Sequence, residues 1–158
     1  MARLLGAVVA TAASMVSADN GDTWMYTLFG ACNAQQDLNG MPFVKQGKTL
    51  SGAPYYKALR AEKYMYYDPD CGEDGEARWV IDVNRPSVNK TSDLDGDGLC
   101  DDIGLMTSQY TFHPPTSGTW NLLCDGEYET RFLVLLEGTT TMTSTTTASG
   151  STSTTSTL

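Results

Sequence analysis

The residues best suited to chemistry lie in one short acidic stretch, DLDGDGLCDDIG, at positions 93–104. Its first three carboxylates stand at every second position, and two adjacent aspartates follow Cys100. Calcium takes six to eight hard oxygen ligands from carboxylates, backbone carbonyls and water. The pattern therefore predicts candidate calcium ligands, one of them a backbone carbonyl, at Asp93, Asp95, Asp97, Leu99, Asp101 and Asp102.

The spacing fits a known loop type only in part. With Asp93 at the first position of an EF-hand-type loop, Gly98 falls at the required turn, but Gly104 stands where a bidentate glutamate is expected. The segments on either side are not helical in pattern, which argues against an EF-hand. Asp102 can replace the missing glutamate in a shorter geometry, and Asp93 to Asp101 resembles the aspartate repeats of thrombospondin type 3. Such a loop predicts weak, extracellular-type affinity, with Kd of about 10⁻⁴–10⁻³ M.

A second interpretation of the same loop needs no metal. Asp-Gly-Asp-Gly is a natural turn sequence, and carboxylates in water require no partner. A disulfide at Cys100 would favour binding, because a pinned loop loses less entropy when its ligands assemble. The sequence leaves both interpretations open.

The ends of the chain differ in composition from its middle. Residues 1–18 combine a basic Arg3, an apolar run and a small-residue site ending at Ala18, a pattern typical of a secretory signal peptide. Residues 138–158 are rich in threonine and serine, which predicts a disordered, O-glycosylated stalk or linker. Residues 19–137 remain as one domain, long enough for a core of its own.

Charge and cysteine content limit the expected partners. The net charge is −9, and removal of Arg3 makes it one unit more negative, so neither nucleic acid nor an anionic membrane is an expected partner. Four cysteines behind a signal peptide predict two disulfides. The absence of a Cys-x-x-Cys pair, with one histidine in the chain, argues against zinc. Asn89 begins an N-glycosylation acceptor. We expect a secreted glycoprotein whose partner is an extracellular protein or glycan.

Short, strand-like runs predict the fold class. Runs such as WMYTLF, YMYY and RWVID are separated by turn residues, and Asn39-Gly40 and Asp125-Gly126 are strong hairpin signals. We expect a small antiparallel all-β domain, with a turn or a single helical turn at residues 57–62 and a strand at 63–67.

Several segments together resemble a known module. GAPYYKA, KYMYYDPDCGED, ARWVID, DLDGDGLCD and GTWNLLCDG occur in an order similar to that of a secreted, cysteine-containing and aromatic-rich module of dinoflagellate proteins. The resemblance covers about residues 26–136, and threonine-rich linkers accompany that module too. It implies a fold and a secreted location but no activity.

The positions of the strands favour one disulfide pairing among the three that are possible. Cys32 ends an N-terminal strand and Cys124 a C-terminal one, so a bond between them would close the domain. Cys71 and Cys100 lie in loops that follow strands, and a bond would join these loops. We predict Cys32–Cys124 and Cys71–Cys100, each contributing about 2–4 kcal/mol.

Aromatic residues support an alternative function. A carbohydrate-binding module would stack sugars on exposed rings, for which the candidates are Tyr56, Tyr66, Tyr67 and Trp79. Alternation along a strand should bury one of Tyr66 and Tyr67 and expose the other. The competing interpretation, which the low aliphatic content favours, places most of these rings in the core.

Catalysis is the least favoured function. Acidic pairs such as Asp68/Asp70 and Asp101/Asp102 could serve a small secreted hydrolase, but they belong to no catalytic motif. Oxidised cysteines leave no thiol nucleophile. We expect an extracellular interaction or structural module, with no cofactor other than weakly bound calcium.

Overall fold

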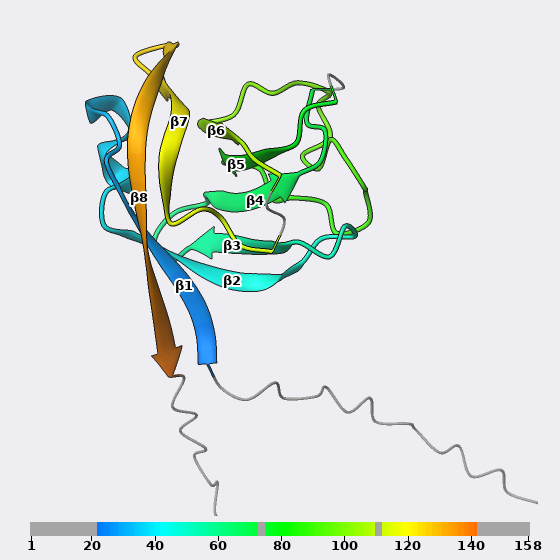
Figure 1. The fold of residues 1–158 in the computed structure, drawn as a ribbon, viewed down its shortest axis with the longest axis horizontal. Helices are drawn as coiled ribbons and strands as arrows, with labels where there is room; N and C mark the ends of the chain where they lie inside the picture. The colour runs from blue at the N-terminus through cyan, green and yellow to red at the C-terminus, as the bar shows by residue number, and fades with distance from the viewer. Residues whose placement is uncertain (1–21, 73–74, 110–111, 142–158) are drawn as a thin grey trace, which may run out of the picture.

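The chain folds into a closed β-barrel in which every strand pairs antiparallel with its neighbours in sequence order (Figure 1). The computed structural model describes residues 22–72, 75–109 and 112–141. This architecture confirms the all-β prediction. The elements are β1 (Asp22–Phe29), a 3₁₀ helix η1 (Asn33–Leu38), β2 (Met41–Lys48), β3 (Pro54–Ala58), β4 (Tyr64–Asp68), β5 (Arg78–Asp82), β6 (Gly104–Thr107), β7 (Ser117–Cys124) and β8 (Glu127–Thr141).

Strands β1 and β8 close the barrel. They pair antiparallel along their full overlap, from Asp22 opposite Thr141 to Phe29 opposite Val134. Strand β8 thus continues four residues beyond the domain boundary expected at Glu137, because β1 offers a partner strand and threonine suits extended backbone. The proposed signal peptide and the remainder of the stalk lie outside the described residues.

The barrel interior is packed with large side chains. An eight-stranded barrel is just wide enough for side chains to fill it. Strand β7 illustrates the pattern, since Trp120, Leu122 and Cys124 are buried while the alternate residues Thr119 and Asn121 are exposed. The other fully buried side chains of the interior include Leu28, Phe43, Met65, Trp79, Ile81, Leu133 and Leu135.

A second, smaller apolar cluster lies outside the barrel wall. Tyr55, Tyr64, Tyr66 and Val80 project from β3, β4 and β5 on the face opposite the interior, and Leu94 packs onto them. Leu94 belongs to the long β5–β6 loop, residues 83–103, which crosses this face. A strip of wall that alternation alone would leave in water is thereby covered.

The local differences from prediction have simple causes. Residues 57–62, expected to form a turn or one helical turn, are the end of β3 followed by a non-helical turn, because Lys57 pairs with Tyr64 in the β3–β4 hairpin. The helix η1 was not predicted. It is followed by Asn39, whose Oδ1 accepts hydrogen bonds from the Gly30 and Ala31 amides. In the described part of the chain, no helix is both long and apolar enough to cross a membrane.

The two disulfides are those predicted. Cys32–Cys124 joins the start of η1 to the end of β7, and Cys71–Cys100 joins the β4–β5 loop to the β5–β6 loop. Such bonds are typical of proteins from oxidising compartments. The second bond lies beside the acidic stretch and restrains the loop that carries it.

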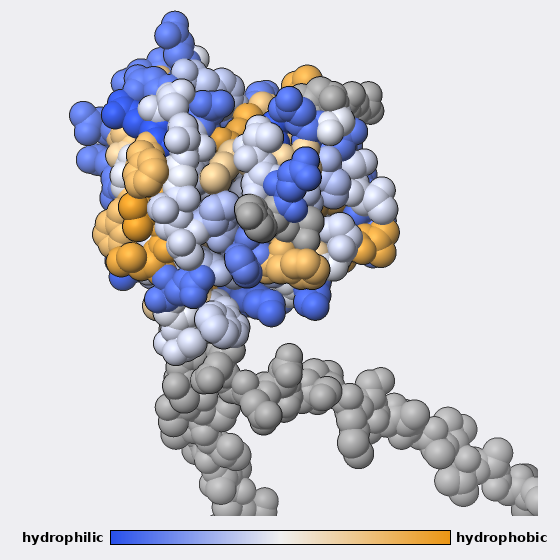
Figure 2. All heavy atoms as spheres, viewed as in Figure 1, coloured by the Kyte–Doolittle hydropathy of each residue, from blue (hydrophilic) through white to orange (hydrophobic). Residues whose placement is uncertain are grey.

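On the surface, apolar side chains gather over the neighbouring strands β1 and β8 (Figure 2). Phe29, Phe132 and Leu136 are 40%, 64% and 55% exposed there. They occupy the outward positions of strands whose inward positions fill the core.

Candidate metal centre

A buried aspartate at the end of β4 holds the acidic loop against the barrel. The carboxylate of Asp68 is fully buried; its Oδ1 accepts the Asp70 amide (2.9 Å) and its Oδ2 the Leu94 amide (2.7 Å). The Asp93 amide donates to the Asp70 carbonyl at 3.1 Å. Together with the Cys71–Cys100 bond, these contacts fix the backbone of the β5–β6 loop where the acidic residues begin.

Asp93 forms the turn itself. Its Oδ1 accepts the Gly96 and Gly98 amides at 3.2 and 2.9 Å, and its Oδ2 pairs with Lys90 at 3.0 Å. Gly96 and Gly98 have φ of +93° and +75°, which glycine adopts without strain. The Gly98 amide, followed by the Lys90 ammonium, lowers the pKa of Asp93. This carboxylate is therefore already satisfied by the chain.

Three other carboxylates converge beside that turn. Asp82 at the end of β5, Asp95 in the loop and Asp102 just before β6 each place an oxygen within 4.8 Å of the other two. Asp82 and Asp102 are each 5% exposed, and Asp95 is partly buried. We call these three residues the acidic centre. It joins two strand ends to the loop between them.

One oxygen of this centre has no partner. Asp82 accepts the Val83 amide on Oδ1 (2.6 Å) and the Asn84 amide on Oδ2 (2.9 Å). Asp102 Oδ2, in contrast, is buried and receives no hydrogen bond. An unsatisfied buried acceptor costs free energy, and a buried carboxylate beside two others costs more unless a cation or a proton compensates it.

Burial, and after it the repulsion between the carboxylates, shifts the pKa values of the acidic centre. Burial, with Asp82 and Asp95 next in importance, raises the pKa of Asp102 to about 8. Burial and the neighbouring Asp97 raise the pKa of Asp95 to about 6, and burial raises the pKa of Asp82. Every shift favours a neutral form, as expected of carboxylates that share a site without a counter-charge.

The donor set suits a hard cation such as calcium. All three ligands are carboxylate oxygens that lie within 4.8 Å of one another, and calcium takes six to eight oxygens at about 2.3–2.6 Å in a flexible geometry. Magnesium is usually held by only one or two carboxylates and keeps several waters. Zinc prefers histidine and cysteine, and all four cysteines form disulfides. The oxygens needed beyond the three carboxylates would be carbonyls or water.

The structure brings together only part of the set proposed from the sequence. Asp95 and Asp102 belong to the acidic centre, whereas Asp97 forms a second trio with Asp93 and Asp95, in which Asp93 is engaged by the turn. Leu99 and Asp101 are exposed and belong to neither trio; the Leu99 amide donates to Asp97 Oδ1 at 2.8 Å.

Sequence reasoning missed Asp82, which lies outside the acidic stretch. The signal was available, since alternation along RWVID turns Trp79 and Ile81 inward and Asp82 outward. What alternation could not indicate is that the acidic loop folds back across that outer face.

The prediction of an exposed sugar-stacking ring is wrong for three of the four candidates. Trp79 (0% exposed) and Tyr67 (5%) fill the barrel, and Tyr66 (1%) lies beneath Leu94 on its outer face. The two tyrosines do point to opposite faces, but the expectation that one is exposed is wrong, because the β5–β6 loop covers the outer one. Tyr56 is 3% exposed but borders a cavity. The core interpretation holds for the other three.

The acidic pair Asp68/Asp70 builds the loop rather than a reaction centre. Asp68 receives the two amides described above, and Asp70 Oδ1 accepts the Gly75 amide at 2.9 Å. Asn89, the glycosylation acceptor, is exposed in the β5–β6 loop, and its amide donates to Ser87 Oγ at 3.2 Å.

Comparison with protein-family models, curated proteins and solved structures gave no match for this chain.

Proposed function

We propose that this protein is a secreted, disulfide-bonded β-barrel module stabilised by one calcium ion at Asp82, Asp95 and Asp102. The observation that carries the proposal is the buried Oδ2 of Asp102, which has no hydrogen-bond partner and belongs to a group of three converging carboxylates. A divalent cation would supply both the missing partner and the missing positive charge.

Protonation is the alternative way to satisfy the acidic centre. It would require the carboxylic acids to stay neutral at a pH well above 3.8, the ordinary pKa of aspartate. Because ligands must be deprotonated, calcium would displace these protons and allow the carboxylates to ionise. Near neutral pH in an extracellular fluid, calcium is therefore the better-matched partner.

The role proposed for calcium is structural. The ion would join the end of β5, the acidic loop and the start of β6, and would add to the restraint from Cys71–Cys100. The barrel surface, above all the loops, would then serve an extracellular interaction with a protein or glycan. No step of catalysis is assigned to the centre.

Thermal unfolding of the oxidised chain in calcium and in chelator tests this function. With a Kd near 10⁻⁴ M, about 10 mM calcium adds about 2.7 kcal/mol, which raises Tm by about 10 °C. The rise should vanish in Asp82→Asn and Asp102→Asn and persist in Asp101→Asn, an exposed neighbour outside the acidic centre. Equal Tm values in calcium and chelator would refute the structural role.

Secretion is proposed from residues 1–18 and from the disulfides. Expression of the whole chain in a eukaryotic secretory host should deliver protein to the medium, with a new N-terminus at Asp19. Mass spectrometry should find glycan at Asn89, and none there in Asn89→Gln. Retention of an intact Met1 inside the cell would contradict this location.

A further inference from the structure

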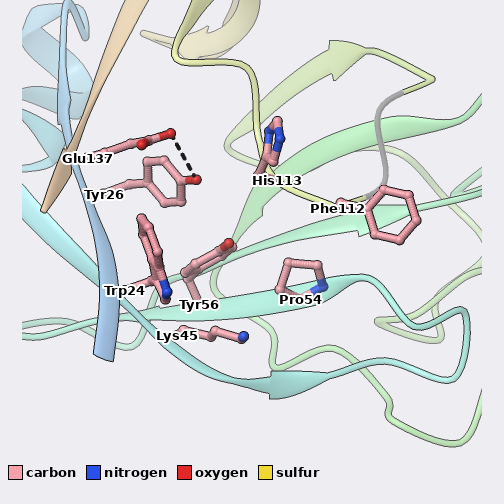
Figure 3. Close-up of a pocket in the computed structure, with 8 residues that line it drawn as sticks. All are labelled: Trp24, Tyr26, Lys45, Pro54, Tyr56, Phe112, His113 and Glu137. Carbon is pink, nitrogen blue, oxygen red and sulfur yellow. Dashed lines mark hydrogen bonds between the residues drawn. The ribbon is translucent and has the colours of Figure 1, made fainter. Parts of the chain in front are cut away.

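A cavity of about 330 Å³ lies away from the acidic centre. Its lining comes from β1, β2, β3, β8 and the segment before β7, and none of these elements carries Asp82, Asp95 or Asp102 (Figure 3). The volume is at the lower end of the range for small-molecule sites, about 300–1,000 Å³. It suits a ligand of one or two rings.

Aromatic rings form much of its wall. Tyr26 and Tyr56 pack edge to face with their ring centroids 5.2 Å apart, and Trp24 lies beside them at the mouth (Figure 3). Trp24 is 49% exposed, whereas Trp79 and Trp120 are fully buried. Phe112, on the far side, is 81% exposed. Tyr26 and Tyr56 therefore line the cavity from the buried core, whereas Trp24 and Phe112 offer open aromatic surface.

Polar groups converge on the same space. The Tyr26 phenol donates to Glu137 Oε1 at 3.5 Å, a long bond that leaves the carboxylate able to accept from a ligand (Figure 3). Burial, and after it Glu137, raises the pKa of Tyr26, while burial and then Tyr26 raise the pKa of Tyr56. Both phenols therefore remain hydroxyls that can donate and accept. Lys45 and His113 complete the polar lining.

This combination discriminates among ligand classes. One carboxylate and one ammonium balance in charge, which disfavours phosphates and other multiply charged anions, and the chain as a whole is acidic. A purely apolar ligand would desolvate Glu137, Lys45 and the phenols without partners. A sugar presents apolar C–H faces to aromatic rings and hydroxyls that donate and accept, so it matches both parts of the wall.

We propose that the cavity bounded by Trp24, Tyr26, Tyr56 and Glu137 binds a neutral mono- or disaccharide, with Trp24 stacking on a sugar face and Glu137 accepting hydrogen bonds from its hydroxyls. This site is independent of the calcium site. It uses Tyr56 of the four rings that the sequence suggested, together with Trp24 and Tyr26, which were not among them.

The test follows the indole N–H signals of the full chain by ¹H–¹⁵N NMR during titration with glucose, galactose, mannose, N-acetylglucosamine, cellobiose and lactose. At least one sugar should shift the Trp24 signal in a saturable way and leave the buried Trp79 and Trp120 signals in place. Calorimetry or amide shifts should give a Kd that rises at least about tenfold in Trp24→Ala and in Glu137→Gln.

Phe132→Ala is the matched control, because Phe132 is 64% exposed and lies on the same strand as Glu137 but outside the cavity. It should bind like the wild type, and equal melting temperatures should show that all three variants are folded. The proposal is overturned if no sugar shifts the Trp24 signal at about 20 mM, a concentration that would detect even millimolar affinity. It is equally overturned if Trp24→Ala binds as tightly as the wild type.

Discussion

Asp82 and Asp102, at opposite ends of the β5–β6 loop, place carboxylate oxygens within 4.8 Å of each other, with a third from Asp95. Asp82 and Asp102 are each 5% exposed, and Asp102 Oδ2 lacks a hydrogen bond. Like charges at such a distance repel, so this arrangement of the loop is unfavourable unless a cation or bound protons compensate the charges.

Asp102→Asn should separate the two effects of this repulsion. In chelator at pH 7.5 the variant should be more stable than the wild type by about 1 kcal/mol or more. The wild-type carboxyl must either stay charged beside Asp82 and Asp95 or take up a proton on folding, whereas the amide is neutral and can donate to its neighbours. Adding calcium should not increase the stability of the variant. Urea unfolding in both buffers measures this, and lower stability of the variant in chelator would argue that Asp102 is not repelled.

The ion-free protein should lose stability as pH rises. Asp102 has a pKa of about 8 when folded, against 3.8 ordinarily, so between these values the folded chain holds more protons than the unfolded chain. The free energy of unfolding should therefore fall from about pH 4 to pH 8 in chelator. The carboxylates of Asp82, Asp95 and Asp97 help to raise the pKa of Asp102. The charge of Asp102 in turn helps to raise the pKa values of the Tyr66 and Tyr128 phenols.

Saturating calcium should flatten this dependence, because the ion keeps the carboxylates ionised in the folded state. Thermal melts at several pH values, with and without calcium, measure both curves. If the two curves run parallel, protons and calcium do not compete for the acidic centre.

Leu94→Ala should weaken the loop and the calcium site together. Leu94 is 1% exposed beneath the loop and packs on Tyr55, Tyr64, Tyr66 and Val80. Truncation of a buried leucine costs about 2–5 kcal/mol. Because Asp95 is the next residue, the Kd for calcium should also rise. Leu99→Ala, at a site 55% exposed, is the control and should change neither quantity appreciably.

The two disulfides should differ in their effect on calcium. Replacing both Cys71 and Cys100 with serine frees the acidic loop and should cost about 2–4 kcal/mol and weaken calcium binding. The same replacement at Cys32 and Cys124 should lower stability by a similar amount, yet leave the calcium Kd of the folded protein nearly unchanged. Calorimetry on the folded variants compares them, and equal losses of affinity would show that the restraint is not local.

Sequence reasoning found the features that local chemistry determines. The strand-like run RWVID predicted β5, and Asp125-Gly126 predicted the β7–β8 turn, where both residues have positive φ. The cysteine positions predicted both disulfides. Cys32–Cys124 joins the ends of the chain's N-terminal and C-terminal parts, and Cys71–Cys100 joins two loops that follow strands.

What the sequence could not reveal is the tertiary course of the long loop. The burial of Tyr66, the Asp68–Leu94 bond and the contribution of Asp82 all depend on residues 83–103 folding back across the outer wall. No local pattern specifies that course. Of the six ligands proposed from the acidic stretch, only Asp95 and Asp102 belong to the acidic centre; Asp93 forms the turn, and Asp97, Leu99 and Asp101 are exposed.

Calorimetric titration of the oxidised chain with calcium at pH 7.5 tests the central claim most directly. We expect one site with a Kd of about 10⁻⁴–10⁻³ M, and a heat of binding that depends on the buffer because protons are released. Binding should be lost in Asp82→Asn and in Asp102→Asn but not in Asp101→Asn. A flat titration, or binding that survives both Asp82→Asn and Asp102→Asn, would contradict it.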